Sequence, residues 1–407
     1  MKWLTCLPLA LLPVLVHAQK PAVRPKPNPN PYAKVDALAL QLPDSDSRDV
    51  SRIARYVDTH FSTPTERTRA IFIWIAENID YDVVNMFALN FYEDTAEKIA
   101  KPLRTRRGIC ENYASLFTAV CNQAGIRSVV VEGYTKQRGF VGYIPHAWSA
   151  AFIDGSWYLF DPTWGSGYVE NNKFVRKINE SYFKATPGSF IGTHIPFDPL
   201  WEFLYYPVTT EDFFNGKTGV DKTKPYFNFP DSIRAYETMS TVERERMAAD
   251  RIEKNGVRNS ATADMIRHLR VDVENYKRQA EADRQNRIVD AANTALRTYN
   301  NAINRFNEFI NYRNAKFKPE KPDAEIRQML DTADHELQRA KTEAAAIVLT
   351  SADTRYEQPL KQLQSGIAEM EPHVREQQEW LTKYFGKGKL GRKSMFYKVT
   401  WFGAPIN

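Results

Sequence analysis

A cysteine at the start of a predicted amphipathic helix is the first candidate for chemistry in this sequence. Cys110 stands in the run RRGICENYASLFTAVCNQAG (106–125), whose apolar residues recur at steps of three and four and so predict a helix. Gly108 precedes it, where the backbone must approach closely, and Gly125 is a good residue to end it. Backbone N–H groups at a helix N-terminus favour a thiolate, so Cys110 is a candidate nucleophile. The alternative is a small buried apolar residue, which most free cysteines are.

A histidine and an aspartate fall on one face of a predicted β-hairpin. The runs HAWSAAFI (146–153) and SWYLF (156–160) are typical of strands, and the Asp-Gly between them is a strong two-residue turn signal. In that register Asp161 follows the second strand and is a diagonal neighbour of His146 on the same face. Such a pair suits a general base and the carboxylate that orients it. The alternative, an exposed histidine and an aspartate that caps a turn before Pro162, does not explain their shared face.

Cysteine spacing adds to the case for Cys110. Cys6 lies in a predicted leader, so only Cys110 and Cys121 remain after processing. Cys121 follows about three helical turns later, roughly 16 Å along the axis, which is too far for a disulfide. An exported protein that keeps an unpaired cysteine in an oxidising compartment has some reason to do so. We expect Cys121 to lie in the core.

The N-terminus predicts export. Residues 1–18 resemble a secretory signal peptide, with Lys2, an apolar stretch and small residues before Gln19. No other segment has the apolar length that crosses a bilayer. We therefore expect a mature protein without an integral membrane segment, located in the periplasm or cell envelope or secreted. Residues 19–32 form a proline-rich linker.

Composition predicts one well-packed domain and a long polar helical region. The chain has 407 residues, 13% of them aromatic, yet the mean hydropathy is only −0.51. A formal charge of +6 is mild at this length, and no dense Lys/Arg tract indicates nucleic-acid binding.

The residues that must position the site lie in a predicted domain over 33–231. The run TPTE (63–66) is a capping box with proline at the first helical position, and it opens a helix to about residue 78. The cysteine helix comes next. A strand over 128–134 and the two hairpin strands follow it.

The second half of the chain predicts helices. Over 232–385 three helices with heptad-spaced apolar residues indicate an antiparallel bundle or coiled coil, with reversals at 318–322 and 351–353. Pro359 and Pro372 predict that the third helix is kinked or interrupted.

The role of the helical region stays open at this point. It has no metal-ligand pattern or phosphate loop, so it is either a spacer or an arm that binds an envelope or surface partner. In the tail, 386–407, the run SMFYKVTWF (394–402) alternates like a strand that docks on a sheet edge or a partner.

Three motifs together resemble the transglutaminase-like (papain-related) cysteine hydrolase superfamily. They are FIWIAENIDYD (72–82), RRGICENYASLF around Cys110, and HAWSAAFIDGSWYLFDPTWG (146–165). The run YFKATPGSFIGTHIPFDPLWEFL (182–204) is similar to the kyphoscoliosis-peptidase-like branch, and it extends the resemblance to about residue 214. The resemblance implies an α+β papain-like core, in which the cysteine helix packs on an antiparallel sheet, followed by the all-α region.

The resemblance also implies roles for the residues. Cys110 would attack an amide carbonyl, His146 would accept and return the proton, and Asp161 would orient the imidazole. The Cys110 backbone N–H would stabilise the oxyanion, and Trp74 is a second candidate whose periodicity equally fits the core.

The resemblance implies less specific roles for other residues of these motifs. Trp148 and Trp164 more readily wall the cleft than contact substrate specifically, and His194 is read as structural.

The expected function is an exported thiol enzyme acting on protein or peptide amides. Water as the acceptor gives a peptidase or deamidase, which we favour, and an amine gives a cross-linker. We expect no metal or other cofactor. The competing function is a non-catalytic binding or envelope-assembly module with a helical adaptor.

Overall fold

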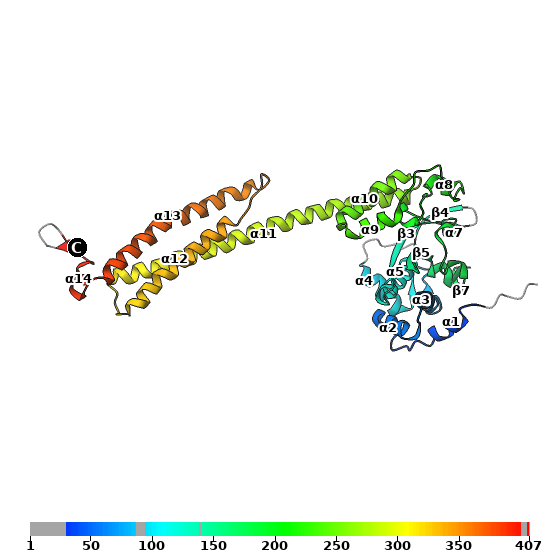
Figure 1. Ribbon diagram of the computed structural model, residues 1–407, viewed down its shortest axis with the longest axis horizontal. Helices are drawn as coiled ribbons and strands as arrows, with labels where there is room; N and C mark the ends of the chain where they lie inside the picture. Colours follow the sequence, from blue (N-terminus) through cyan, green and yellow to red (C-terminus); the bar gives the residue numbers. More distant parts are fainter. Residues whose placement is uncertain (1–29, 87–93, 138–139, 400–404, 407) are drawn as a thin grey trace, which may run out of the picture. The chain divides into compact units, whose positions relative to one another are not determined.

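The computed structural model describes residues 30–86, 94–137, 140–399 and 405–406 (Figure 1). The described chain forms two compact units, which we treat separately. The first extends to Ser240 and includes Met247–His268, and the second contains Thr241–Arg246 and the chain from Leu269 onward. The predicted boundary at residue 231 falls inside helix α9 (Phe229–Thr238). The predicted leader and most of the predicted linker lie outside the described residues.

Helices form the N-terminal part of the first unit. The side chain of Thr63 accepts a hydrogen bond from the Glu66 N–H at 3.1 Å, and the Glu66 carboxylate accepts one from the Thr63 N–H at 3.0 Å, so the predicted capping box is confirmed. The helix that it opens ends at Asn78, as predicted. The helices are α1 (Ala33–Ala39), α2 (Val50–His60), α3 (Pro64–Asn78), α4 (Thr95–Thr105) and α5 (Cys110–Gln123).

A four-stranded antiparallel sheet packs beside α5. Its order is β5-β4-β3-β8, with β3 (Ser128–Gln137), β4 (Phe140–Ile153), β5 (Ser156–Phe160) and β8 (His194–Pro196). Ile153 pairs with Ser156 across the two-residue turn, which confirms the predicted hairpin register. Helix α5 contacts both β4 and β3, so the cysteine helix packs on an antiparallel sheet as expected.

A buried arginine on α3 links two other segments of the first unit. Arg69 on α3 is fully buried, and its guanidinium binds Asp36 of α1 and Glu180 of η1 (Glu180–Tyr182) at N–O distances of 2.6 and 2.5 Å. A charge this deep is stable only when it is paired and hydrogen-bonded, and here both conditions hold. The clamp therefore fixes two segments that are far apart in sequence.

Short elements complete the first unit. Strands β1 (Asp80–Tyr81) and β2 (Arg107–Gly108) pair in parallel directly before α5. The others are α6 (Pro162–Ser166), β6 (Gly167–Glu170), β7 (Lys173–Arg176), η1, α7 (Pro187–Phe190), η2 (Pro199–Glu202), α8 (Thr210–Phe214), α9 and the part of α10 (Thr241–Asn255) from Met247 onward.

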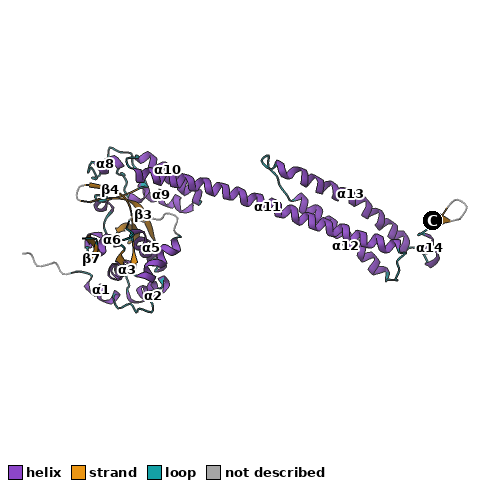
Figure 2. Ribbon diagram, turned by 180° about the vertical axis from the view of Figure 1, so that it is seen from behind, coloured by secondary structure: helices purple, strands orange, loops and turns teal. Residues whose placement is uncertain are grey.

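The second unit is a helical bundle with its own core (Figure 2). It contains most of α11 (Ser260–Asn314), together with α12 (Asp323–Ala345) and α13 (Thr354–Phe385), and the chain reverses at both predicted breaks. The fold class, an α+β core followed by a helical region, is confirmed. Among the described residues, no helix combines the length and the apolarity needed to cross a membrane.

The predicted interruption of the third bundle helix is wrong. Helix α13 runs unbroken from Thr354 to Phe385 with Pro359 and Pro372 inside it. Each proline costs about 3 kcal/mol in a helix interior. The apolar face of α13, including Ile367 and Val374, is buried in the bundle core, and that burial offsets the cost.

The C-terminal tail contains only short elements in its described part. Helix α14 (Lys389–Ser394) is followed by β9 (Lys398–Val399), which pairs antiparallel with β10 (Pro405–Ile406). The predicted strand over 394–402 is thus reduced to its centre, and its last residues lie outside the described part of the chain.

Candidate active site

Cys110 is the first residue of α5, as predicted, and the turn before it is tightly held. The Ile109 N–H donates to the Asn112 side chain at 2.9 Å, and the Asn112 amide donates to the Lys98 carbonyl at 3.0 Å. A Cβ on Gly108 would lie 2.7 Å from the Asn112 Cβ, so the predicted close approach at Gly108 is confirmed. Cys110 and Cys121 are both free and buried, and burial raises the pKa of the Cys121 thiol well above its usual value.

His146 and Asp161 meet at the end of the hairpin. The His146 Nε2 lies 2.8 Å from the Asp161 Oδ2, which agrees with the diagonal relation that the register predicts. Cys110 also interacts with the ring, since it helps to raise the pKa of His146. Since Nε2 faces the carboxylate, Nδ1 is the nitrogen left for the thiol. The imidazole thus bridges the sulfur and the carboxylate.

The protonation states follow from this bridge. Burial alone would lower the pKa of His146, but the Asp161 charge and hydrogen bond, together with Cys110, raise it to about 10. Burial alone would raise the pKa of Asp161, but His146 and a second histidine, His194, hold it well below its usual range. The carboxylate is therefore ionised and the neighbouring imidazole holds its proton at neutral pH, which is the arrangement that stabilises a thiolate.

The second oxygen of Asp161 fixes the carboxylate. Its Oδ1 accepts the N–H groups of Thr163 at 2.9 Å and Trp164 at 3.1 Å, so Asp161 is also the N-cap of α6. Asp161 is completely buried, and its charge is balanced by these donors and by the histidines on Oδ2. A buried carboxylate with four donors cannot rotate without losing several hydrogen bonds.

With this geometry in view, comparison with known proteins identifies the domain. Residues 51–162 match the family model of the transglutaminase-like superfamily. This part of the chain is a transglutaminase-like domain. It is similar to kyphoscoliosis peptidase from Homo sapiens (36% identity) and from Mus musculus (40% identity), over 192 residues in each case. The domain therefore belongs to the kyphoscoliosis-peptidase-like group of that superfamily.

The matched region is a limited part of each protein. Both matches cover 45% of this chain and only 28% of the curated relative. Among solved structures, the periplasmic domain of TgpA from Pseudomonas aeruginosa is similar at 22% identity, over 32% of this chain and 48% of that one. Its TM-score of 0.24 is too low to add to the fold assignment.

The three tryptophans named from the sequence lie in different places of the transglutaminase-like domain. Trp164 is half-buried, with its ring centroid 5.4 Å from that of His146, a position that fits a cleft wall. Trp148 is buried, and its ring centroid is 6.2 Å from that of His146. Trp74 lies in the main core under the Arg106 guanidinium, and its assignment as an oxyanion donor stays a prediction.

Tyr81 belongs to the site although sequence reasoning gave it no role. Burial raises the pKa of its phenol, and the charges of Cys110 and Asp161 raise it further, so the hydroxyl keeps its proton. Its position follows from the β1–β2 pair, which sets Tyr81 opposite Gly108. The only sequence signal was its place in the motif over 72–82.

His194, which the sequence suggested was structural, also reaches the site. Its Nε2 lies 3.2 Å from the Asp161 Oδ2, the same oxygen that His146 contacts. The ligand atoms of His146, Asp161 and His194 lie within 4.8 Å of one another, a grouping that could hold a metal ion. A tetrahedral ion with bonds near 2.1 Å would separate its ligands by roughly 3.3 Å. The 2.8 Å contact is shorter and fits a hydrogen bond, so this arrangement is better described as a hydrogen-bonded group.

Proposed function

We propose that the transglutaminase-like domain is a thiol enzyme that cleaves or deamidates protein or peptide amides. The observation that carries the proposal is the bridging imidazole, with Cys110 on one side and the buried Asp161 carboxylate 2.8 Å away on the other. A pure binding surface has no need for a thiol at a helix N-terminus that shares a hydrogen-bonded imidazole with an ionised carboxylate. The peptidase names of the relatives also support it.

Each group has a role in the proposed reaction. The Cys110 thiolate attacks the amide carbonyl carbon, and a C–S bond forms while the carbonyl oxygen becomes an oxyanion. The His146 imidazolium then gives its proton to the leaving nitrogen as the C–N bond breaks. Water, deprotonated by the neutral imidazole, hydrolyses the thioester and restores the thiol. Asp161 keeps the imidazole oriented throughout.

The oxyanion lies near the start of α5 in this mechanism. The Cys110 backbone N–H is in the first turn of the helix, where it has no partner within the helix. A helix N-terminus stabilises negative charge, so this N–H is a suitable donor. A second donor would come from a side chain beside the thiol.

The test begins with the thiol itself. We expect iodoacetamide to label Cys110 below neutral pH in the wild-type protein, and His146→Ala to reduce that labelling to the rate of an ordinary thiol. Cys121 is the internal control because its buried thiol has a raised pKa and should stay unlabelled. Ordinary reactivity of Cys110 at pH 6 would contradict the proposal and favour the binding-module alternative.

The acceptor is tested with a peptide library, once with water alone and once with a labelled primary amine. Cleaved or deamidated peptides that require Cys110 support hydrolysis, and amine incorporation that requires Cys110 would instead support cross-linking. A Cys110→Ala variant is the control in both arms. If wild type and Cys110→Ala give the same products, the enzyme proposal fails.

Export is part of the proposal and rests on the leader-like residues 1–18. We expect the protein in the periplasm, the envelope or the medium, with Gln19 as its first residue. Cell fractionation measures the location of the protein, and mass spectrometry of the N-terminal peptide identifies its first residue. A cytoplasmic protein that keeps Met1 would contradict this part.

A further inference from the structure

Asp161 has two imidazoles on one oxygen. The Oδ2 atom faces Nε2 of His146 at 2.8 Å and Nε2 of His194 at 3.2 Å, while Oδ1 is occupied by backbone N–H groups. His194 belongs to β8, at the edge of the sheet beside β3, and its side chain is completely buried. A buried polar ring on the carboxylate of the proposed triad is not needed by the mechanism above, so its contribution requires an explanation.

The tautomer of His194 follows from its two polar contacts. Its Nδ1 lies 2.8 Å from the Thr193 hydroxyl. An ionised carboxylate accepts and cannot donate, so Nε2 must carry the hydrogen and Nδ1 must accept from the hydroxyl. The hydroxyl of Thr193 could otherwise donate to the Phe190 carbonyl, but that contact is longer, at 3.4 Å. The Asp161 carboxylate therefore sets the tautomer of His194, and the Thr193 hydroxyl supports that tautomer as a donor to Nδ1.

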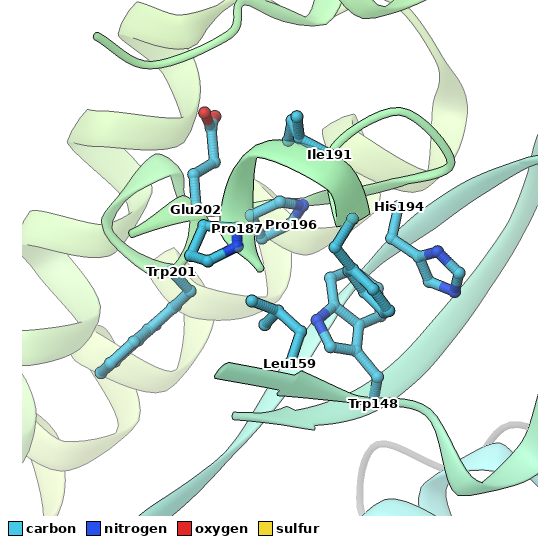
Figure 3. A pocket seen from close by; sticks show the side chains of 9 residues that line it. Trp148, Leu159, Pro187, Ile191, His194, Pro196, Trp201 and Glu202 are labelled. Atoms are coloured by element: carbon cyan, nitrogen blue, oxygen red, sulfur yellow. The ribbon is translucent and has the colours of Figure 1, made fainter. Parts of the chain in front are cut away.

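The surroundings keep this ring neutral. Phe190 stacks on it with centroids 4.1 Å apart, and Trp164 meets it edge-on at 4.8 Å. Burial, together with the charge of the neighbouring His146, lowers the pKa of His194 to about 4 against the opposing effect of Asp161. In Figure 3 the ring turns away from Trp201 and Glu202, which line the far side of a small cavity. The ring nitrogens of His194 are thus directed toward Asp161 and Thr193 and not toward the cavity.

We propose that His194 is a positioning residue of the thiol site: as a neutral donor whose tautomer is supported by the Thr193 hydroxyl, it holds Oδ2 of Asp161 in the orientation that stabilises the protonated ring of His146. This rests on the proposed function of Cys110, His146 and Asp161. Removal of the donor leaves the buried carboxylate with one hydrogen bond fewer. Its charged form is then less stable and its orientation less fixed, so it supports the His146 imidazolium less well.

Other titratable groups face the same cluster and must stay unchanged in the test. They are Cys110 of α5, Tyr81 of β1 and Tyr182 of η1. Burial and the Asp161 charge raise the pKa of Tyr182 to about 12, so neither tyrosine titrates in the range of the experiment.

The experiment measures the rate of Cys110 alkylation by iodoacetamide against pH in the full-length protein. In the wild type we expect a plateau that begins where the thiolate–imidazolium pair forms and ends where His146 loses its proton. In His194→Phe, which keeps the ring stack and removes both nitrogens, we expect the plateau to narrow from both ends by about one pH unit, a tenfold change in each equilibrium. His194→Gln keeps an N–H donor and should restore most of the width.

Thr193 supplies a second, milder pair of variants. Thr193→Val removes the hydroxyl that supports the donor tautomer and should narrow the plateau, whereas Thr193→Ser keeps the hydroxyl and should leave the plateau unchanged. If His194→Phe does not fold, the two Thr193 variants test the proposed role of His194 in its place. A merely structural role would lower the rate at every pH without moving either end of the plateau.

The outcomes separate the two proposals. If wild-type Cys110 shows no plateau below neutral pH, the proposed function fails and this inference fails with it. If the wild type has the plateau and both His194→Phe and Thr193→Val retain its full width, only the role of His194 is overturned.

Discussion

At the scale of single residues, two histidines on one carboxylate have opposite protonation states. His146 lies beside both the thiol and Asp161 and has its pKa raised to about 10, whereas His194 lies among aromatic rings and has its pKa lowered to about 4. Both are within hydrogen-bonding distance of the same oxygen. Two positive rings on one buried carboxylate would repel each other, so the more buried ring stays neutral.

These shifts predict a maximum of stability near pH 6.5. The folded pKa of His146 is above its unfolded value of about 6.5, so its contribution is complete below pH 6.5 and is lost as pH rises toward 10. The folded pKa of His194 is below that value, so its contribution is complete above pH 6.5 and is lost as pH falls toward 4. The change amounts to about 5 kcal/mol for His146 and about 3 kcal/mol for His194.

Urea unfolding followed by tryptophan fluorescence between pH 4 and 10 measures this curve. His194→Phe should flatten the acid side, because it removes the group that must take up a proton there, and it should move the alkaline side to lower pH, because loss of the donor lowers the pKa of His146. An acid side as steep as that of the wild type would show that other groups control it. Asp161, with its depressed pKa, loses its contribution only at pH values below this window.

Tyr81 and Trp74 offer a comparison of oxyanion donors. The Tyr81 hydroxyl is protonated and its pKa responds to the charge of Cys110, whereas Trp74 packs in the core under Arg106. We expect Tyr81→Phe to lower turnover about 100-fold and Trp74→Phe to lower it far less, since loss of one oxyanion donor costs about that much. Cys110 alkylation should be nearly unchanged in Tyr81→Phe. A larger loss of turnover in Trp74→Phe than in Tyr81→Phe would indicate that Trp74 is the oxyanion donor.

At the scale of elements, the close contact of β3 with β8 sets the position of His194. Gly133 on β3 lies between His146 on β4 and Pro196 on β8. A Cβ at Gly133 would lie 2.1 Å from the Ile195 carbonyl oxygen, a backbone atom that cannot move alone. The sheet can therefore keep β8 in place only if this position has no side chain.

Gly133→Ala should separate β8 from β3 and destabilise the first unit by about 3 kcal/mol. It should also narrow the alkylation plateau, because His194 moves with β8. Gly188→Ala is the matched control, since a Cβ there has no neighbour within 4 Å. Equal melting temperatures for the two variants would contradict the close contact.

Local patterns in the sequence predicted the elements that carry the site, whereas contacts between distant segments were not predictable. The hairpin register brings His146 and Asp161 together through a two-residue turn, so nearby residues were sufficient. His194 reaches Asp161 only because β8 pairs with β3, and a three-residue strand has no usable periodicity. The position of Tyr81 depends on the two-residue parallel pair of β1 and β2, which is likewise too short to show a periodicity. Pro372 misled the helix prediction because bundle packing outweighs the local cost.

At the scale of the whole molecule, the two units have separate cores. The first core surrounds α3 and α5, and the second is shared by α11, α12 and α13. Leu337 on α12 is fully buried in the second core and makes no part of the candidate site. The stability of the bundle can therefore be changed while the proposed thiol site is left intact.

Leu337→Ala should destabilise the bundle by about 3 kcal/mol. Hydrogen exchange with mass spectrometry should show faster exchange in α12 and α13, while exchange in α5 and the pH profile of Cys110 alkylation stay at wild-type values. Val348 is exposed, so Val348→Ala is the control variant. It should change neither the hydrogen-exchange rates nor the pH profile of Cys110 alkylation. Faster exchange throughout α5 in Leu337→Ala would show that the two units unfold as one.

The double use of Asp161 has a consequence for how such a chain can diverge over time. One oxygen caps α6 and the other meets two imidazoles, so any exchange of this residue disturbs the fold and the chemistry together. Cys110 and His146 carry no comparable capping duty. In descendants that abandon thiol chemistry, we therefore expect the aspartate to outlast the cysteine. A retained aspartate in such a lineage would record a constraint of folding and should not be taken as a sign of surviving catalysis.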